Sequence, residues 1–335
     1  MSEKGIFVIS LDFELNWGVH DRFPNERYRK NLLGAREVIP ILLQRFKEHQ
    51  IHATWAIVGL LFFSKKEQMV KEIPDLLPDY DDIKLSAYAH MKNIGLNEME
   101  DPIHYGSSLV KLIQKESTQE IASHTFSHYY CLAKGQNQKA FEADTKQAIK
   151  VAKRKGLPAM NSIVFPRNQI NTHYLETCKQ LGITVYRGCE DHWLYKVIHK
   201  KDGLLKRTIR LLDSYINISG HHIYGIESLL ETNGMVNIPS SRFLRPYSKR
   251  LRYLEPIKLN RIKMAMTKAA QEGRVFHLWW HPHNFGICMK ENLQVLDSVI
   301  DHFLTLQEQY GMKSMSMNEV REKLILEQTS ISYYK

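Results

Sequence analysis

The sequence contains little cysteine and no long apolar run. Its four cysteines, among 335 residues, are scattered and show no CxxC spacing, which argues against a disulfide framework or a CxxC-type site. No stretch reaches the roughly 18 consecutive apolar residues that a membrane-spanning helix requires. The first residues, MSEKGIFVISLDFEL, lack the apolar segment behind basic residues that marks a signal peptide. We therefore expect a cytoplasmic protein with reduced thiols.

Acidic residues are outnumbered, with 36 Asp and Glu against 46 Lys and Arg, giving a formal net charge of +10. Much of the excess lies in two basic segments, residues 196–210 and 242–263. Such segments favour nucleic acid, an anionic membrane surface or a phosphorylated substrate. No zinc-finger or RNA-recognition motif accompanies the charge, so we expect no nucleic acid partner. A solvated basic face is the simplest interpretation, and peripheral membrane contact through these segments is the second. Nothing indicates an oligomeric state.

Short apolar runs alternate with longer amphipathic ones, which predicts an α/β fold. Residues 6–12 and 52–58 are typical of buried strands, and residues 34–49 between them have apolar side chains at helical spacing. The pattern continues with strands at 120–123, 162–165, 183–187, 235–239, 275–280 and 313–317, and with helices at 137–155, 171–182 and 291–309. Ser316 and Glu319 have the spacing of a capping box that opens a final helix.

Seven or eight such units without internal repeats predict a distorted (β/α) barrel rather than an open sheet. No flexible linker or low-complexity tract interrupts the chain. We expect one domain over residues 1–335, with long inserted loops at about 64–118 and 190–234.

The first candidate for chemistry is the pair Asp12 and Glu14 at the end of the first strand. Side chains alternate along a strand, so the two carboxylates share one face and Phe13 turns to the other. Two close carboxylates repel each other unless a cation or a shared proton relieves them. In a parallel barrel the carboxyl ends of the strands are where catalytic groups gather. A strand that simply ends in a polar loop is the alternative.

The second candidate is the pair His124 and His128, which follows the third strand. Two histidines four residues apart share one face if the chain turns helical there, and can then hold one metal ion. Among 16 histidines such a pair also arises by chance. Together with a carboxylate, however, two histidines leave a coordination position open for water, as hydrolytic metal sites require.

Two further motifs follow later strands. Arg167, in Phe165-Pro-Arg-Asn-Gln, could pair with a carboxylate and hold it ionised, or form a purely structural ion pair. His281 ends the strand His277-Leu-Trp-Trp and is suited to act as a general acid. His277 lies deeper in that strand and is expected to be a hydrogen-bonded core residue.

These motifs, LDFE, SHTFSH, FPRNQ and LWWHPHN, resemble in their order those of the NodB-type polysaccharide deacetylases, carbohydrate esterase family four. The resemblance extends from residue 5 to about 320 and implies a distorted barrel. It implies that Glu14, His124 and His128 bind a metal. It also implies that Asp12 is the base, held by Arg167, and that His281 is the acid. Phe13 stands where the family commonly has a second aspartate, so this is an Asp-x-Glu variant, and a metal-ligand role for Asp12 stays open.

The resemblance implies hydrolysis of an N-acetyl or other N-acyl group on a sugar. Zinc is the expected metal for two histidines and a carboxylate, with cobalt, nickel or manganese as alternatives. Because we expect a cytoplasmic protein, we expect the substrate to be a nucleotide-linked or lipid-linked precursor of a surface polysaccharide. Candidate sugar contacts are Trp17, Trp193, Trp279, His283 and Asn284.

Two other functions are compatible with these motifs. One is an amidohydrolase on the same fold that cleaves a formamide or a cyclic amide. The other is a glycan-binding protein without catalysis. The presence of Asp12, Arg167 and His281 favours an enzyme, because a binding protein needs no groups for proton transfer.

Overall fold

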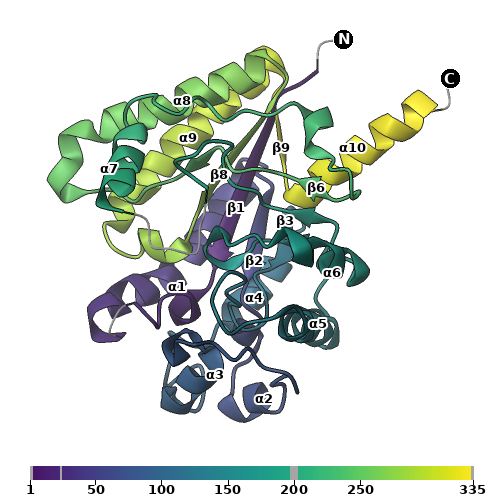
Figure 1. The fold of residues 1–335 in the computed structure, drawn as a ribbon. Helices are drawn as coiled ribbons and strands as arrows, with labels where there is room; N and C mark the ends of the chain where they lie inside the picture. Colours follow the sequence, from purple (N-terminus) through teal and green to yellow (C-terminus); the bar gives the residue numbers. More distant parts are fainter. Residues whose placement is uncertain (1–2, 23–24, 197–202, 333–335) are drawn as a thin grey trace.

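The centre of the computed structural model, which describes residues 3–22, 25–196 and 203–332, is a curled sheet of parallel strands (Figure 1). The strand order is β6-β5-β4-β3-β2-β1-β8-β7, and β9 pairs with the first residues of β1. The strands are β1 (Ile6–Phe13), β2 (Ala53–Ile57), β3 (Gln119–Ser123), β4 (Ser162–Ile163), β5 (Val185–Tyr186), β6 (Val236–Asn237), β7 (Arg242–Phe243), β8 (Val275–Trp280) and β9 (Lys313–Met315).

Four of the α-helices in the described part of the chain have eight residues or fewer. The helices are α1 (Asn25–Glu48), α2 (Lys66–Val70), α3 (Ala87–His90), α4 (Ser107–Gln114), α5 (Gln138–Arg154), α6 (Leu175–Gln180), α7 (Leu204–Asp213), α8 (Glu255–Gln271), α9 (Met289–Tyr310) and α10 (Met317–Ser332). Figure 1 shows α2 and α3 at the lower end of the view, away from the N-terminus and α10.

Alternation along β1 separates two cores. Phe7, Ile9, Leu11 and Phe13 pack with apolar residues of α1, α4, α8 and α9 on the outer side of the sheet. Ile6 and Val8 belong instead to a smaller inner cluster that Met317, Val320 and Leu324 of α10 complete. Since side chains alternate, Asp12 shares the inner face with Val8. The sequence of β1 thus fills one end of the curled sheet with apolar side chains and leaves carboxylates at the other end.

The expected α/β barrel is confirmed, as a sheet that curls without full closure. Strands β6 and β7 are the two ends of the strand order, and no ladder between them is found in the described part of the chain. The predicted long helices correspond to α1, α5 and α9. The capping box of α10 is confirmed, because the Ser316 backbone N–H donates to the Glu319 carboxylate at 2.7 Å.

The two segments predicted as insertions differ in content. Residues 64–118 contain α2, α3 and α4, and residues 190–234 contain α7. The basic segment 242–263 contains β7 and most of α8, elements that we did not predict. The single-domain assignment remains a prediction. None of the described helices combines the length and apolar character needed to cross a membrane.

Candidate active site

Glu14 lies directly after β1 and precedes a short 3₁₀ turn, Leu15–Gly18. Both Glu14 and Asp12 are buried, with 4% and 3% of their surface exposed. Gly18 makes room for the Glu14 side chain, since a Cβ atom at Gly18 would lie 2.0 Å from its carboxylate carbon. The close approach of this turn therefore fixes where the carboxylate points.

His124 and His128 lie on the loop after β3, and this loop is not the helical turn on which the interpretation of their spacing was conditional. Thr125 and His128 instead have left-handed backbone conformations, with φ of 62° and 59°. The buried carboxylate of Asp144, on α5, accepts the backbone N–H groups of Phe126 and Ser127 at 2.7 and 3.3 Å. These bonds replace helical ones and bring the two imidazoles to the same side.

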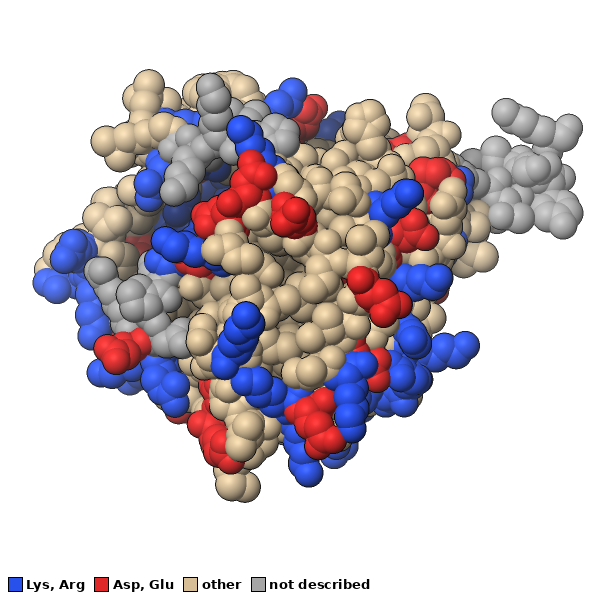
Figure 2. All heavy atoms as spheres, turned by 60° about the horizontal axis from the view of Figure 1, so that its bottom comes forward, with Lys and Arg blue, Asp and Glu red and all other residues tan. Residues whose placement is uncertain are grey.

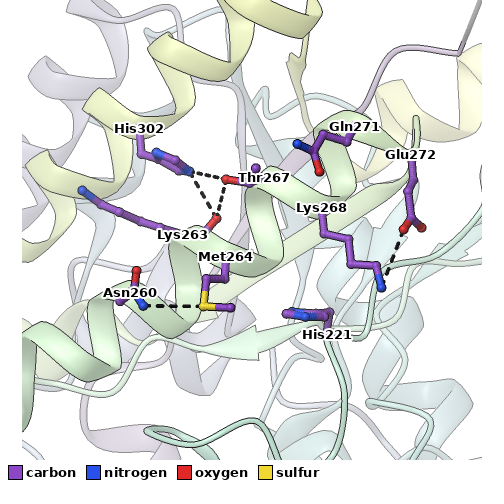
Figure 3. Close-up of a pocket in the computed structure, with 9 residues that line it drawn as sticks. All are labelled: His221, Asn260, Lys263, Met264, Thr267, Lys268, Gln271, Glu272 and His302. Atoms are coloured by element: carbon purple, nitrogen blue, oxygen red, sulfur yellow. Dashed lines mark hydrogen bonds and ion pairs between the residues drawn. The ribbon is translucent and has the colours of Figure 1, made fainter.

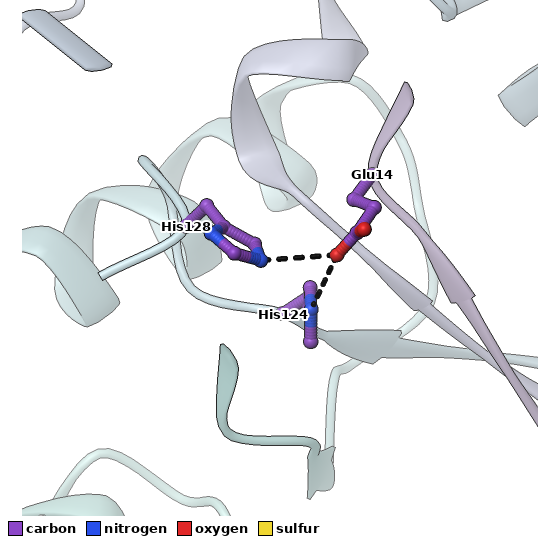
Figure 4. A group of neighbouring side chains, drawn as sticks. All are labelled: Glu14, His124 and His128. Atoms are coloured by element: carbon purple, nitrogen blue, oxygen red, sulfur yellow. Dashed lines mark hydrogen bonds and ion pairs between the residues drawn. The ribbon is translucent and has the colours of Figure 1, made fainter. Parts of the chain in front are cut away.

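The structure brings Glu14, His124 and His128 together in one buried cluster (Figure 4). The Glu14 Oε2 atom lies 3.0 Å from His128 Nε2 and 3.4 Å from His124 Nε2. One ligand atom of each residue lies within 4.8 Å of the others. Burial raises the pKa of Glu14, but the neighbouring imidazoles outweigh it and hold this pKa well below its ordinary value. The carboxylate is therefore ionised at neutral pH.

The hydrogen bonding of the two histidines fits a divalent cation. His124 Nδ1 lies 2.8 Å from the Val164 carbonyl oxygen and must donate to it, which leaves a lone pair on Nε2. That Nε2 atom is buried and has no hydrogen-bond partner. Burial lowers the pKa of His128 to about 4 despite the nearby Glu14. Both imidazoles are thus suited to act as neutral ligands beside the carboxylate.

Asp12 is held by Arg187 rather than by Arg167, which corrects our expectation. The Arg187 guanidinium donates to both Asp12 oxygens, at 2.7 and 2.8 Å, and Asn168 Oδ1 accepts from the same guanidinium at 2.9 Å. Burial raises the pKa of Asp12, but the charge and hydrogen bonds of Arg187 and the nearby imidazoles of His124 and His281 together outweigh burial, and the pKa is lowered. Arg187 directly follows β5. Although β5 and β1 are not neighbours in the strand order, the curl of the sheet lets Arg187 reach Asp12 on the inner face of β1.

Arg167 points elsewhere because of its backbone. It lies in a short turn after β4 with φ of 56° and ψ of 24°, in the left-handed region. Its guanidinium donates to Asp21 at 2.5 Å and covers the Tyr130 ring, with 4.3 Å between the guanidinium carbon and the ring centroid. Asp21, and not Asp12, is therefore the carboxylate that Arg167 meets.

His281 lies between the two carboxylates of the site. Its Nε2 atom is 3.7 Å from Asp12 Oδ2 and 3.6 Å from Glu14 Oε1, and 22% of its side chain is exposed. The Nδ1 atom lies 3.3 Å from Asn284 Oδ1, to which it can donate. Asn284, a candidate sugar contact, therefore also orients His281. His283 is buried and stacks on His281 with 4.9 Å between ring centroids.

The tryptophans proposed as sugar contacts have different environments. Trp17 is completely buried and donates through Nε1 to the His104 carbonyl oxygen at 2.8 Å, so it cannot stack on a sugar. Trp279 is only partly buried, and its ring lies against Arg187 and His281. Trp193 is 57% exposed. Of the three tryptophans, Trp279 is the one that lies against residues of the candidate site.

Sequence reasoning missed two residues that shape this site, Arg187 and Asp144. An arginine directly after the apolar run Ile183–Tyr186 was a usable signal, of the same kind as the one that pointed to Arg167. No sequence signal pointed to the buried role of Asp144, because an acidic residue in an amphipathic helix is ordinarily solvent-exposed. His277 is the hydrogen-bonded core residue that we expected, with Nε2 at 2.8 Å from Ser10 Oγ.

Charged side chains and a cavity are also found away from the site. Figure 2 shows the end that carries α2 and α3, where charged side chains surround a region formed largely by other residues. A separate cavity of about 490 Å³ opens on α8 (Figure 3), and none of the residues of the site lines it. It is bordered by Lys263, Met264, Lys268 and His302, among others, and Lys268 pairs with Glu272 at 3.7 Å.

Comparison with known proteins supports the resemblance. Residues 33–186 match the family model of polysaccharide deacetylases, a range that includes His124, His128 and Arg167. Similar solved structures include a candidate polysaccharide deacetylase from Mycobacterium smegmatis, 12% identical, which covers 98% of this chain and 92% of its own length with a TM-score of 0.61. The comparison with curated proteins gives no match.

Two glucan-modifying enzymes have related folds. A 4-alpha-glucanotransferase from Thermococcus litoralis is 11% identical over 96% of this chain and 40% of its own, with a TM-score of 0.54. A GH57-type branching enzyme from Pyrococcus horikoshii is 13% identical over 95% and 70%, with a TM-score of 0.53. At these identities the likeness shows the fold alone.

Proposed function

Because residues 33–186 match the family model of polysaccharide deacetylases, we propose that the chain is a metal-dependent hydrolase that removes an N-acetyl or other N-acyl group from a sugar. One observation carries the proposal. Glu14, His124 and His128 converge on one buried point, with an ionised Asp12 and the partly exposed His281 beside them. This is the set of ligands, base and acid that amide hydrolysis requires.

Each residue of the site has a role that its contacts support. A divalent cation held by Glu14, His124 and His128 would polarise the amide carbonyl and acidify a water molecule. Asp12, kept ionised by Arg187, accepts the proton of the attacking water. His281, oriented by Asn284, donates a proton to the departing nitrogen. The products are a carboxylate, acetate in the simplest case, and an amino sugar.

We further propose a cytoplasmic precursor as the substrate, an acylated sugar carried on a diphosphate or a lipid during synthesis of a surface polysaccharide. The basic segments 196–210 and 242–263 support this proposal, because they could meet a diphosphate or an anionic membrane surface. Zinc is the metal that we propose first, on the basis of two imidazoles and one carboxylate.

Metal analysis together with acetate release from N-acetylated chitooligosaccharides tests the function. The wild type should bind one equivalent of zinc, and the combined change Glu14→Ala, His124→Ala, His128→Ala should remove it. Asp12→Asn should keep the metal and lose about 10²-fold or more in turnover, the usual scale of acid–base catalysis. His52→Ala is the matched control, since His52 pairs with Glu319 away from the site. Equal metal content in the wild type and the triple variant would refute the proposal.

A further inference from the structure

The position of Arg167 raises a question that the proposed reaction leaves unanswered, because Arg187 already holds Asp12. Arg167 and Asn168 are consecutive non-glycine residues with left-handed backbone conformations, φ of 56° and 53°. Such conformations are costly for residues with a Cβ atom and persist where surrounding structure imposes them, often at functional sites. Asn168 uses this geometry to bind Arg187, and Arg167 uses it to reach Tyr130.

Arg167 lies close to the metal-ligand cluster. The ring of Tyr130 packs edge-on against the ring of the ligand His128, with 5.0 Å between centroids, and the Arg167 guanidinium lies 4.3 Å from the centroid of Tyr130. The guanidinium is therefore no farther from His128 than these two distances combined. A hexose whose acyl group sits at the cluster can place another of its substituents beside this guanidinium.

The hydrogen-bonding capacity around Arg167 is incompletely used. Arg167 Nε, Tyr130 Oη and His20 Nε2 are all buried and have no hydrogen-bond partner. Buried polar atoms are nearly always paired in native proteins, so a group of unpaired ones near a site indicates a missing ligand or water. Of the five donors of the guanidinium, one bonds to Asp21, the carboxylate that neutralises it.

A second cation adds to the positive charge there. Arg22 directly follows Asp21 and is exposed. Arg22 is thus next in the chain to the residue whose carboxylate pairs with Arg167. Asp21 supplies one negative charge and Arg22 and Arg167 supply two positive ones, so the three side chains together keep a net positive charge that an anionic group can neutralise.

We propose that Arg167, Arg22 and Tyr130 form a subsite for an anionic group of the substrate, a carboxylate or a phosphate on the acylated sugar. The inference rests on the proposed deacetylation and specifies its substrate class as an acidic sugar. A guanidinium recognises either group through two parallel hydrogen bonds, and its stacking on Tyr130 pre-orients that fork. A purely structural ion pair of Arg167 with Asp21 is the alternative that the experiment must separate.

Binding of three monosaccharides to the zinc-loaded full-length chain tests the subsite, with Asp12→Asn introduced throughout to prevent turnover. N-acetylglucosamine is neutral, N-acetylmuramic acid adds a carboxylate, and N-acetylglucosamine 1-phosphate adds a phosphate. We expect at least one acidic ligand to bind tenfold or more tightly than the neutral one. Arg167→Ala should abolish this preference and change the affinity for N-acetylglucosamine less than twofold. Which acidic ligand responds identifies the anion.

Three variants keep the result interpretable. Arg167→Lys preserves the charge without the planar fork and should retain part of the preference. Arg22→Ala, at an exposed position, should reduce the preference without affecting folding. Arg45→Ala is the matched control, because Arg45, on α1, likewise pairs with a single carboxylate, that of Asp297, away from the site.

Two outcomes would overturn the subsite. One is equal affinity of the wild-type site for neutral and acidic sugars, and the other is an equal loss of both in Arg167→Ala. Acetate release from N-acetylglucosamine or its oligomers by the chain with Asp12 intact separates this failure from failure of the proposed function. Release without acid preference refutes the subsite alone, whereas absence of both metal and release refutes the deacetylase itself.

Discussion

At the scale of single residues, the Arg187–Asp12 pair decides whether the site has a base. Both side chains are almost completely buried, and the guanidinium donates to both carboxylate oxygens. Taking two charges out of water is costly, and the pair persists because Ser10, Asn168 and the carboxylate accept hydrogen bonds from both terminal nitrogens of the guanidinium. Asp12 is thereby kept charged in a place where burial alone would favour its neutral form.

The pH dependence of turnover should report this pairing. Arg187 lowers the pKa of Asp12, so in Arg187→Met only burial and the imidazoles remain and the pKa should rise. Because a base acts in its ionised form, the acidic limb of the kcat/KM profile should move to higher pH, with about tenfold or greater loss at neutral pH. Steady-state kinetics across pH, with Arg45→Met as control, measure this. An unmoved limb would exclude Asp12 as the titrating base.

Sequence patterns located the ligand residues but could not choose between the two arginines. Alternation along one strand places Asp12 and Glu14 on one face, so local geometry suffices for these two residues. The spacing of four pointed to His124 and His128, but a loop with left-handed residues, held by Asp144, brings their imidazoles together. Arg167 and Arg187 both follow short apolar strands. Which of them faces Asp12 depends on the curl of the sheet and on a left-handed turn at Arg167, and neither is encoded by residue spacing.

At the scale of elements, the site depends on segments that are tied down by buried polar contacts. The Asn16 side chain lies 2.6 Å from His104 Nε2 and 3.2 Å from His90 Nε2, and Asp101 lies 2.7 Å from His104 Nδ1. These contacts fasten the segment 64–118 to the turn that follows Glu14. The composition of that segment indicates an insertion, but contacts between such distant residues could not be predicted.

A second anchor joins α7 to the sheet. Asp213, at the end of α7, is buried and accepts hydrogen bonds from Arg242 on β7 at 2.7 Å, from Tyr195 and from two backbone N–H groups. Burial raises the pKa of Asp213, but these hydrogen bonds and the charge of Arg242 outweigh it and lower the pKa. The ionised carboxylate therefore stabilises the fold.

Asp213→Asn should lower the free energy of unfolding by about 3 kcal/mol at pH 7, because it leaves Arg242 buried without its counter-charge. A carboxyl whose pKa is lowered on folding stabilises the native state above its unfolded pKa. This stabilisation is lost as pH falls towards the folded value. The difference between wild type and variant, measured by urea unfolding, should therefore shrink from pH 7 to pH 3. A difference that stays constant would show that the charge of Asp213 contributes nothing.

Strand length limited what could be predicted at this scale. The strands β4, β5, β6 and β7 have two residues each, too few for an alternating pattern to identify them alone. We missed β7 and α8 because basic side chains dominate residues 242–263, and the buried apolar face of α8, with Ile262, Ala265, Met266 and Ala269, begins only at the end of that segment. Tertiary burial, rather than a clear local pattern, makes this segment helical.

At the scale of the whole molecule, exposed apolar side chains occur together with basic ones on two segments. Leu204 and Leu205 of α7 are 78% and 74% exposed, and Tyr253, just before α8, is 79% exposed. Arg207 and Arg252 lie on the same two segments. A surface of this composition is suited to an anionic lipid layer, since each basic residue near such a layer contributes about 1 kcal/mol and exposed leucines can enter it.

Vesicle sedimentation tests whether this surface binds membranes. The chain should sediment with vesicles containing phosphatidylserine and not with pure phosphatidylcholine, and added salt should release it because salt screens charges beyond about 10 Å. The double change Leu204→Glu, Leu205→Glu should weaken binding about tenfold or more. It removes two leucines that would be buried in the lipid, and the two introduced acids repel the anionic surface. The matched control is Ile83→Glu, Leu96→Glu, because both positions are 66% exposed within the segment 64–118. Equal binding of both double variants would mean that the leucines of α7 do not contact the membrane.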